Sequence, residues 1–169
     1  MAFDAIETPF GSSWKGADKP EVTMVEFFDY ACPYCKASNP QVDKLLQEDK
    51  GLRVVYRELP ILGPDSITSA RLSLEASRLG RFAQFHDSLW AAGRPAPDTN
   101  AAAAKIAGID ATPKNDPEVE AELKKNLQLA GQLGATGTPL FVVGNRVMNG
   151  AVGYDALKQA ITAARAKSS

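Results

Sequence analysis

The chain has 169 residues, of which 44% are hydrophobic and 23% are charged, a composition typical of a globular protein. A chain of this length buries roughly two-thirds of its unfolded surface, so it folds without a disulfide staple or a metal. We expect one domain, with room for an insertion. The 19 basic and 20 acidic residues give a formal net charge of -1. This balance excludes a bulk electrostatic attraction to nucleic acid or to an anionic membrane.

Nothing in the sequence predicts a membrane segment, because no apolar run reaches the about 18 residues that a spanning helix needs. The start of the chain, MAFDAIETPF, lacks the charged and apolar regions of a secretory signal. We therefore expect either a cytoplasmic protein or the mature form of an exported one. Two cysteines do not separate these compartments.

The N-terminal region, residues 1–19, shows little periodicity and is predicted to be a loose arm that Trp14 pins to the body. Residues Val22 to Phe28 are nearly all apolar, which is typical of a central strand covered on both faces. Helical spacing of apolar residues begins at Cys32, and Pro40 is expected to kink that helix.

A second strand is predicted over Leu52 to Leu59, a stretch rich in β-branched and aromatic residues. The resulting strand, helix and strand predict two parallel strands with a right-handed crossover. Helical periodicity then extends from Ser66 to Gly134. Within it, Asp98-Thr99 and Asp116-Pro117 have the composition of helix starts, and Gly108 that of a helix stop.

Strand chemistry returns near the C-terminus, where Leu140 to Met148 is predicted to form a β-hairpin and Tyr154 to Ala166 a last helix. The fold class is therefore α/β, and without the helical block the order of elements is the thioredoxin topology. We predict a thioredoxin-like domain at 1–63 and 134–169, with an N-terminal arm at 1–20. The helical insertion is predicted at 64–133.

The two cysteines of the chain stand in Cys32-Pro33-Tyr34-Cys35, directly after the first predicted strand. A pair at this spacing is typical of a dithiol that cycles between thiol and disulfide. Cys32 is predicted to be the nucleophile, because unpaired N–H groups at the start of a helix stabilise a thiolate. Cys35, one turn later, is predicted to be the resolving thiol. Pro33 suits an early helical position, which needs no N–H.

Two structural alternatives for this pair are weaker. A staple that closes four residues contributes only about 2 kcal/mol, which is little for a domain of this size. A closed zinc site takes four ligands, whereas the chain offers two cysteines and His86. We therefore expect no metal, and no cofactor beyond the redox-active Cys32–Cys35 disulfide. His86 is predicted to pack or cap a helix, and its aromatic neighbours to belong to the core.

Glu26 lies six residues before Cys32 in the apolar strand. A buried carboxylate is costly unless it is protonated, hydrogen-bonded or able to relay a proton, so Glu26 is predicted to accept a proton from Cys35. The alternative is a strand-edge glutamate that reaches solvent. Pro139 precedes the third strand, where a trans turn proline is favoured by sequence alone. A cis bond would bring the Thr138 backbone to the dithiol, where it could pair with an extended substrate.

Three segments, VEFFDYACPYCK, RELPILGPDS and GATGTPLFVVGNRVMNGAV, resemble the DsbA-type thiol:disulfide interchange proteins. The resemblance extends roughly from Val22 to Ala164. It implies a thioredoxin fold with an inserted helical domain. The family's catalytic cysteine pair then corresponds to Cys32 and Cys35, and the acid six residues earlier to Glu26. The family's cis-proline loop corresponds to Thr138 and Pro139.

The same resemblance implies an exported, usually periplasmic enzyme. We predict that it oxidises protein thiols and is itself reoxidised by a DsbB-like membrane partner. The short N-terminal arm shows no dimerisation domain, so we expect a monomer. One residue departs from the pattern, because the best-known members carry histidine where this chain has Tyr34. We therefore expect Pro33 and Tyr34 to tune the oxidising strength of the pair.

Three alternatives remain open from the sequence. The enzyme could run as a reductase or isomerase kept reduced by a DsbD-like donor, and Thr138 does not settle this direction. Cys-Pro-Tyr-Cys is also the tetrapeptide of the cytosolic glutaredoxins, although those short proteins have no room for a helical block. From another class, the chain could be a non-catalytic, chaperone-like module that binds peptides.

Overall fold

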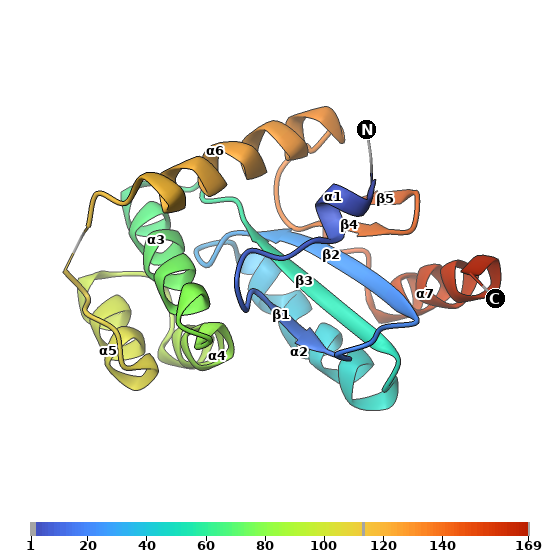
Figure 1. The fold of residues 1–169 in the computed structure, drawn as a ribbon, viewed down its shortest axis with the longest axis horizontal. Coiled ribbons are helices and arrows are strands. Elements are labelled where there is room, and N and C mark those ends of the chain that lie inside the picture. Colours follow the sequence, from blue (N-terminus) through green and yellow to red (C-terminus); the bar gives the residue numbers. More distant parts are fainter. Residues whose placement is uncertain (1–2, 113, 169) are drawn as a thin grey trace.

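The computed structural model describes residues 3–112 and 114–168 (Figure 1). Within this part of the chain, one sheet has the strand order β1-β3-β2-β4-β5. Strand β2 runs parallel to β3 and antiparallel to β4, as the predicted crossover and hairpin require. The strands are β1 (Trp14–Gly16), β2 (Val22–Phe28), β3 (Leu52–Glu58), β4 (Leu140–Val143) and β5 (Arg146–Asn149).

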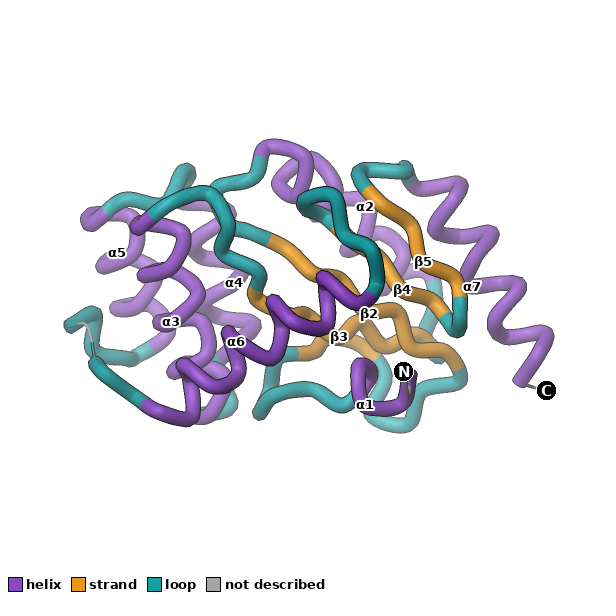
Figure 2. The backbone as a smooth tube through the Cα atoms, turned by 90° about the horizontal axis from the view of Figure 1, so that it is seen from above, coloured by secondary structure: helices purple, strands orange, loops and turns teal. Residues whose placement is uncertain are grey.

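Helices cover both faces of this sheet, and three of them gather at one end (Figure 2). Helices α1 and α6 lie over one face, and α2 and α7 pack on the other. The cluster at the end consists of α3, α4 and α5. The helices are α1 (Phe3–Glu7), α2 (Pro33–Glu48), α3 (Pro64–Arg78), α4 (Phe82–Ala92), α5 (Pro97–Ala107), α6 (Pro117–Gln132) and α7 (Tyr154–Ser168).

Strand β2 is central, as its apolar sequence predicts. Because successive side chains of a strand face opposite sides, β2 contributes to two separate cores. Met24 and Phe28 pack in the core that α2 and α7 share with the cluster of α3, α4 and α5, whereas Val25 and Phe27 pack in the core beneath α1 and α6. The dithiol follows β2 closely, so its position is fixed by the central strand of the sheet.

The prediction of a loose N-terminal arm was wrong for the described residues. Strand β1 pairs antiparallel with β3, with Trp14 opposite Val55, and the Arg53 guanidinium lies 4.2 Å from the centroid of the Trp14 ring. Helix α1 buries Ile6 against the sheet. A strand of three residues has no alternation to detect, and its partner β3 lies far along the chain, so local sequence gave no signal.

A buried arginine ties α1 and α6 to the sheet. The Nε atom of Arg57 in β3 donates to the carbonyl of Ile6 at 2.9 Å. Its Nη1 atom donates to Glu122 at 3.0 Å and to Asn126 at 2.9 Å, both in α6. The last helix of the predicted insertion therefore packs on the sheet itself. The domain division at 64–133 stays a prediction.

Local signals placed several helix ends well. The Asp116 side chain accepts hydrogen bonds from the N–H groups of Glu118 and Val119, as expected of an N-cap. Gly108 ends α5 with φ 72°, in the left-handed region that glycine favours. The start of α5 was predicted slightly late, because Ala96 is the N-cap and Pro97 rather than Asp98 or Thr99 takes the first helical position.

Two leucines of the helical block do not belong to its core. Leu79 and Leu127 match the helical periodicity of the block, yet both side chains are exposed. Helix α2 continues through Pro40 to Glu48, and the kink expected at Pro40 stays a prediction. No helix in the described residues combines the length and the apolar composition that crossing a bilayer would need.

Candidate active site

Cys32 is the N-cap of α2, with φ -82° and ψ 118°, and Pro33 takes the first helical position, as predicted. The Cys32 N–H donates to the carbonyl of Asp29 at 3.0 Å, so a tight turn joins β2 to α2. The residue is 5% exposed, and it lines a pocket that opens to the surface. Its thiol is therefore held at a helix N-terminus and within reach of a partner.

Cys35 lies one turn further along α2 and is fully buried. Burial raises the pKa of the Cys35 thiol, and the charge of Glu26 raises it further. Hydrogen bonds with the Asp29 backbone and the Thr138 side chain act in the opposite direction on this pKa. Both cysteines are free thiols in this structure. The two cysteines thus have different environments: Cys32 lines a surface pocket, whereas Cys35 is enclosed and its thiol resists ionisation.

Glu26 is 3% exposed in β2, between β3 and β4, so it is not a strand-edge residue reaching solvent. Burial raises its pKa from 4.5 to about 8, which the positive charge of Lys15 opposes and the charge of Asp43 reinforces. At neutral pH the carboxyl therefore carries a proton. Its charge acts on the Cys35 thiol, so the two groups are coupled in their ionisation.

The loop that precedes β4 completes the site from the far end of the chain. The peptide bond between Thr138 and Pro139 is cis. Antiparallel pairing of β4 with β2 sets Leu140 opposite Phe27, which brings this loop to the end of β2. The Cys32 Sγ donates to the Thr138 carbonyl oxygen at 3.4 Å. The structure therefore brings together Glu26, both cysteines and the proline loop.

Tyr34 differs from these residues, because its side chain is 66% exposed. Its backbone carbonyl accepts a hydrogen bond from Ser38 at 2.8 Å, which belongs to the helix rather than to the site. No ring contact joins Tyr34 to a described residue. That Tyr34 tunes the oxidising strength of the dithiol stays a prediction. Such an influence would come from the exposed side of the Cys-Pro-Tyr-Cys tetrapeptide.

Asp29 was not predicted from the sequence, although it organises the site. Its Oδ1 atom accepts from the Ala31 N–H at 2.8 Å, and its Oδ2 atom accepts from the N–H groups of Ile61 and Leu62 at 2.8 and 3.0 Å. One carboxylate thus fixes the turn before Cys32 and the loop after β3. The sequence signal that could have indicated this role is an aspartate at the end of a predicted strand, where its side chain can accept hydrogen bonds from the backbone of the following turn.

A second polar network behind the site was also missed. The Ser73 hydroxyl of α3 donates to Glu58 at 2.7 Å and lies 2.9 Å from the Tyr30 hydroxyl. Glu58 is buried at the end of β3, and burial raises the pKa of its carboxyl. The network therefore connects the active-site turn to the helical block.

This network gives a stability prediction. Replacing Tyr30 by phenylalanine removes one hydroxyl from the buried network and keeps the ring, which stacks edge-on against Phe28 and Phe85. We expect the free energy of unfolding to fall by about 1 kcal/mol. Urea denaturation measures this loss, with exposed Tyr34→Phe as the matched control. An equal loss in both variants would contradict a role for the network.

His86 packs in the core, as predicted. Its Nε2 atom accepts from the indole N–H of Trp90 at 3.1 Å, and Phe28 and Tyr56 lie against its ring. Burial lowers the pKa of His86 to about 4, so the ring is neutral at physiological pH. Among the described residues, no group of His, Cys, Asp or Glu side chains clusters as metal ligands would.

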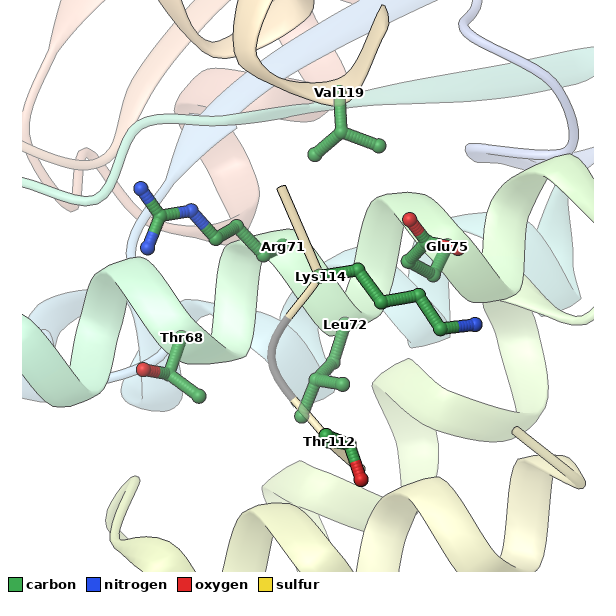
Figure 3. A pocket seen from close by; sticks show the side chains of 7 residues that line it. All are labelled: Thr68, Arg71, Leu72, Glu75, Thr112, Lys114 and Val119. Carbon is green, nitrogen blue, oxygen red and sulfur yellow. The ribbon is translucent and has the colours of Figure 1, made fainter. Parts of the chain in front are cut away.

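A separate cavity lies between α3 and the connection that leads into α6 (Figure 3). It measures about 20 Å³, which is room for about one water molecule. Arg71 and Lys114 line it, and Leu72 and Val119 contribute apolar side chains from opposite sides. None of these residues approaches the dithiol, so the cavity does not belong to the candidate active site.

The fold and the site define a class: a thioredoxin-like protein with a helical insertion and a dithiol at the start of a helix. The profile of the DSBA-like thioredoxin domain matches residues 23–162. The chain belongs to this family, whose members are thiol-disulfide oxidoreductases.

Two solved structures resemble the chain over nearly its whole length. A thioredoxin-like oxidoreductase from Silicibacter pomeroyi DSS-3 is 34% identical, with a TM-score of 0.89, covering 98% of this chain and 99% of that one. A periplasmic thioredoxin-like protein from Salmonella enterica serovar Typhimurium is 32% identical, with a TM-score of 0.87, covering 97% of this chain and 95% of that one.

Curated relatives include larger proteins. The Na(+)/H(+) antiporter NhaA 1 of Salinispora arenicola is 30% identical over 157 residues, which cover 89% of this chain but 24% of the antiporter. The chain thus spans about a quarter of the length of that relative. Disulfide bond formation protein D of Bacillus subtilis is 27% identical, covering 86% of this chain and 73% of that protein.

Proposed function

We propose that the protein is a thiol:disulfide oxidase that introduces disulfides into exported protein substrates. The observation that carries the proposal is the Cys32 thiol at the N-terminus of α2, 3.4 Å from the Thr138 carbonyl oxygen and open to the surface. A helix N-terminus favours the thiolate and hence the reduced form of the pair, which makes its disulfide a stronger oxidant. The relative named for disulfide bond formation supports this direction.

The reaction begins with the Cys32–Cys35 disulfide. A client thiolate attacks the Cys32 sulfur, the bond to Cys35 breaks, and its electron pair stays on the Cys35 sulfur. A second client thiolate then attacks the client sulfur of the mixed disulfide and releases Cys32 as a thiolate. The client loses two electrons and two protons in total, and the enzyme dithiol gains the electrons.

Glu26 supplies the proton that this sequence needs inside the protein. Burial disfavours the Cys35 thiolate, which must be protonated as it leaves. The Glu26 carboxyl holds a proton at neutral pH, since its pKa is raised to about 8, and it lies in the same buried region. In the reverse direction the same carboxylate accepts the proton of Cys35.

Thr138 positions the client. Its carbonyl oxygen stands beside Cys32, and an extended client segment that pairs with this loop places its own sulfur next to the nucleophile. The periplasm is the proposed compartment, supported by the periplasmic relative from Salmonella enterica. A membrane oxidase of the DsbB type is the proposed acceptor of the electrons, and the chain is proposed to act as a monomer.

The reduction potential of the Cys32–Cys35 pair tests the direction. Equilibration with glutathione buffers, followed by alkylation of free thiols, measures the oxidised fraction. We expect a potential above about -180 mV, in the range of strongly oxidising pairs. A potential near the about -270 mV of thioredoxin would overturn the oxidase proposal in favour of a reductase. The Tyr34→His variant shows in parallel whether the exposed tetrapeptide position tunes this potential.

A further inference from the structure

A pocket of about 140 Å³ opens beside the nucleophile. One side comes from the turn between β2 and α2 and the first turn of α2, with Tyr30, Cys32 and Lys36. The other side comes from the connection between α4 and α5, with Gly93 and Arg94. The helical block therefore supplies one wall of the pocket that a client must enter.

This pocket is positively charged. Lys36 and Arg94 both line it, and no acidic residue does. Both side chains are exposed, and among the described residues no carboxylate forms an ion pair with either cation. Other arginines are engaged, as shown by the ion pairs of Arg57 and Arg71. Two free cations therefore stand at the nucleophile of a chain whose net charge is -1.

The nearest turn adds no compensating charge to the pocket. Asp29 is 2% exposed, and its two oxygens accept hydrogen bonds from three backbone N–H groups. A carboxylate that is buried and engaged in this way does not pair with an exposed cation across the pocket. The two cations are thus available to a ligand.

We propose that this pocket selects protein clients that carry an aspartate or glutamate within about two residues of the reacting cysteine, a reach of about 7 Å of extended chain. The inference rests on the proposed function and names its substrate class. An acidic neighbour raises the pKa of a client thiol and slows its attack on disulfides. Lys36 and Arg94 offset that penalty by holding the carboxylate while the client sulfur meets Cys32.

An extended protein segment fits the surroundings better than a small thiol does. Ile61 and Leu62 are 45% and 47% exposed, and their N–H groups are bound by Asp29, which places both at the edge of the active-site turn. Tyr34 is a third exposed apolar side chain near the dithiol. A client segment covers these surfaces while its carboxylate reaches the pocket, whereas glutathione is too short to do both.

The test uses three dithiol peptides that are identical except for the residue next to the first cysteine, which is Glu, Gln or Lys. Each rate is divided by the uncatalysed rate of the same peptide with a small neutral disulfide, which removes the effect of the neighbour on thiol reactivity. We expect normalised kcat/KM to fall in the order Glu, Gln, Lys. Two exposed ion pairs of about two- to fivefold each give a ratio of about tenfold between Glu and Lys.

Salt and charge reversal identify the residues responsible. In about 0.5 M NaCl the ratio of normalised kcat/KM between the Glu and Lys peptides should fall toward one, because exposed charges are screened. Arg94→Glu should reverse the order of the Glu and Lys peptides, and Lys36→Gln should reduce the preference about threefold. Arg146→Glu is the matched control, because Arg146 is an exposed arginine of β5 at the opposite end of the sheet. This control should leave the order unchanged.

The outcomes separate the two proposals. If the wild type oxidises none of the peptides, the proposed function fails. If it oxidises all three at equal normalised rates, the proposed function stands and the charge preference is overturned. If Arg94→Glu slows exchange with glutathione disulfide as much as exchange with the Glu peptide, the pocket takes a free carboxylate ligand and the commitment to protein clients is overturned.

Discussion

Replacement of Cys32 by serine is expected to abolish exchange, reducing the oxidation of a reduced client to the rate in buffer alone. A serine hydroxyl forms no mixed disulfide, and Cys35 is fully buried and resists ionisation, so it does not take over the attack. Within residues 3–112 and 114–168, the Cys32 sulfur makes one hydrogen bond, to the Thr138 carbonyl, which a hydroxyl can also donate. The variant should therefore fold normally.

The matched variant is Cys35→Ala, which keeps the nucleophile. It should react with an activated or mixed disulfide and then accumulate the covalent adduct, visible as a higher mass on a non-reducing gel. Folding of both variants is checked by circular dichroism. If client oxidation persists in Cys32→Ser, Cys32 is not the catalytic nucleophile, and the alternative of a peptide-binding module is favoured.

The second large effect is expected from Glu26→Gln, through the pH dependence of stability. In the folded protein the Glu26 carboxyl keeps its proton until about pH 8, whereas in the unfolded chain it ionises near 4.5. The native state thus binds more protons between these values, so the free energy of unfolding falls as pH rises through this window. The total loss is about 5 kcal/mol, since one pKa unit corresponds to about 1.4 kcal/mol.

Glutamine has no proton to lose, so the variant should lack this decline. Urea denaturation at pH 5, 7 and 9 should show the variant gaining stability relative to the wild type as pH rises. Asp18→Asn, at an exposed position, is the control and should follow the wild type. Resolution of mixed disulfides by the variant should slow at least about tenfold at pH 7. Parallel stability curves for wild type and Glu26→Gln would mean that Glu26 is not protonated in the fold.

His86 acts on stability in the opposite direction and does not obscure this comparison. Its pKa is lowered from 6.5 to about 4, so the stability that the neutral ring contributes is present above pH 6.5 and is lost as pH falls toward 4. This contribution is the same in the wild type and the Glu26→Gln variant. The difference between their curves therefore isolates Glu26.

The sequence predicted those parts of the site whose signals are local. An apolar strand followed by Cys-Pro-Tyr-Cys placed the dithiol on a helix start, and Asp116 before proline placed a helix cap. Strand β1 could not be predicted, because three residues carry no periodicity and the pairing with β3 is a long-range contact. The burial of Glu26 depended on which strands flank β2, which only the folded topology decides.

Side chains that join distant elements were missed for the same reason. Asp29 binds a loop that follows another strand, and Tyr30 reaches Glu58 through Ser73 of a helix. Each residue type is ordinary in its own segment. Their roles arise only when the strand ends and the helical block meet. Lys36 and Arg94 likewise line one pocket only because the fold brings their segments together.

The contact between Cys32 and Thr138 spans 106 residues of sequence. We expect such a contact to form late, because the chain must first meet the entropy cost of closing a long loop. The nucleophile is therefore made early in synthesis, whereas the loop that positions clients arrives with the C-terminal hairpin. Until then the dithiol is an ordinary pair of accessible thiols. The rate at which Cys32 reacts with a small alkylating reagent can therefore be used to follow the completion of folding.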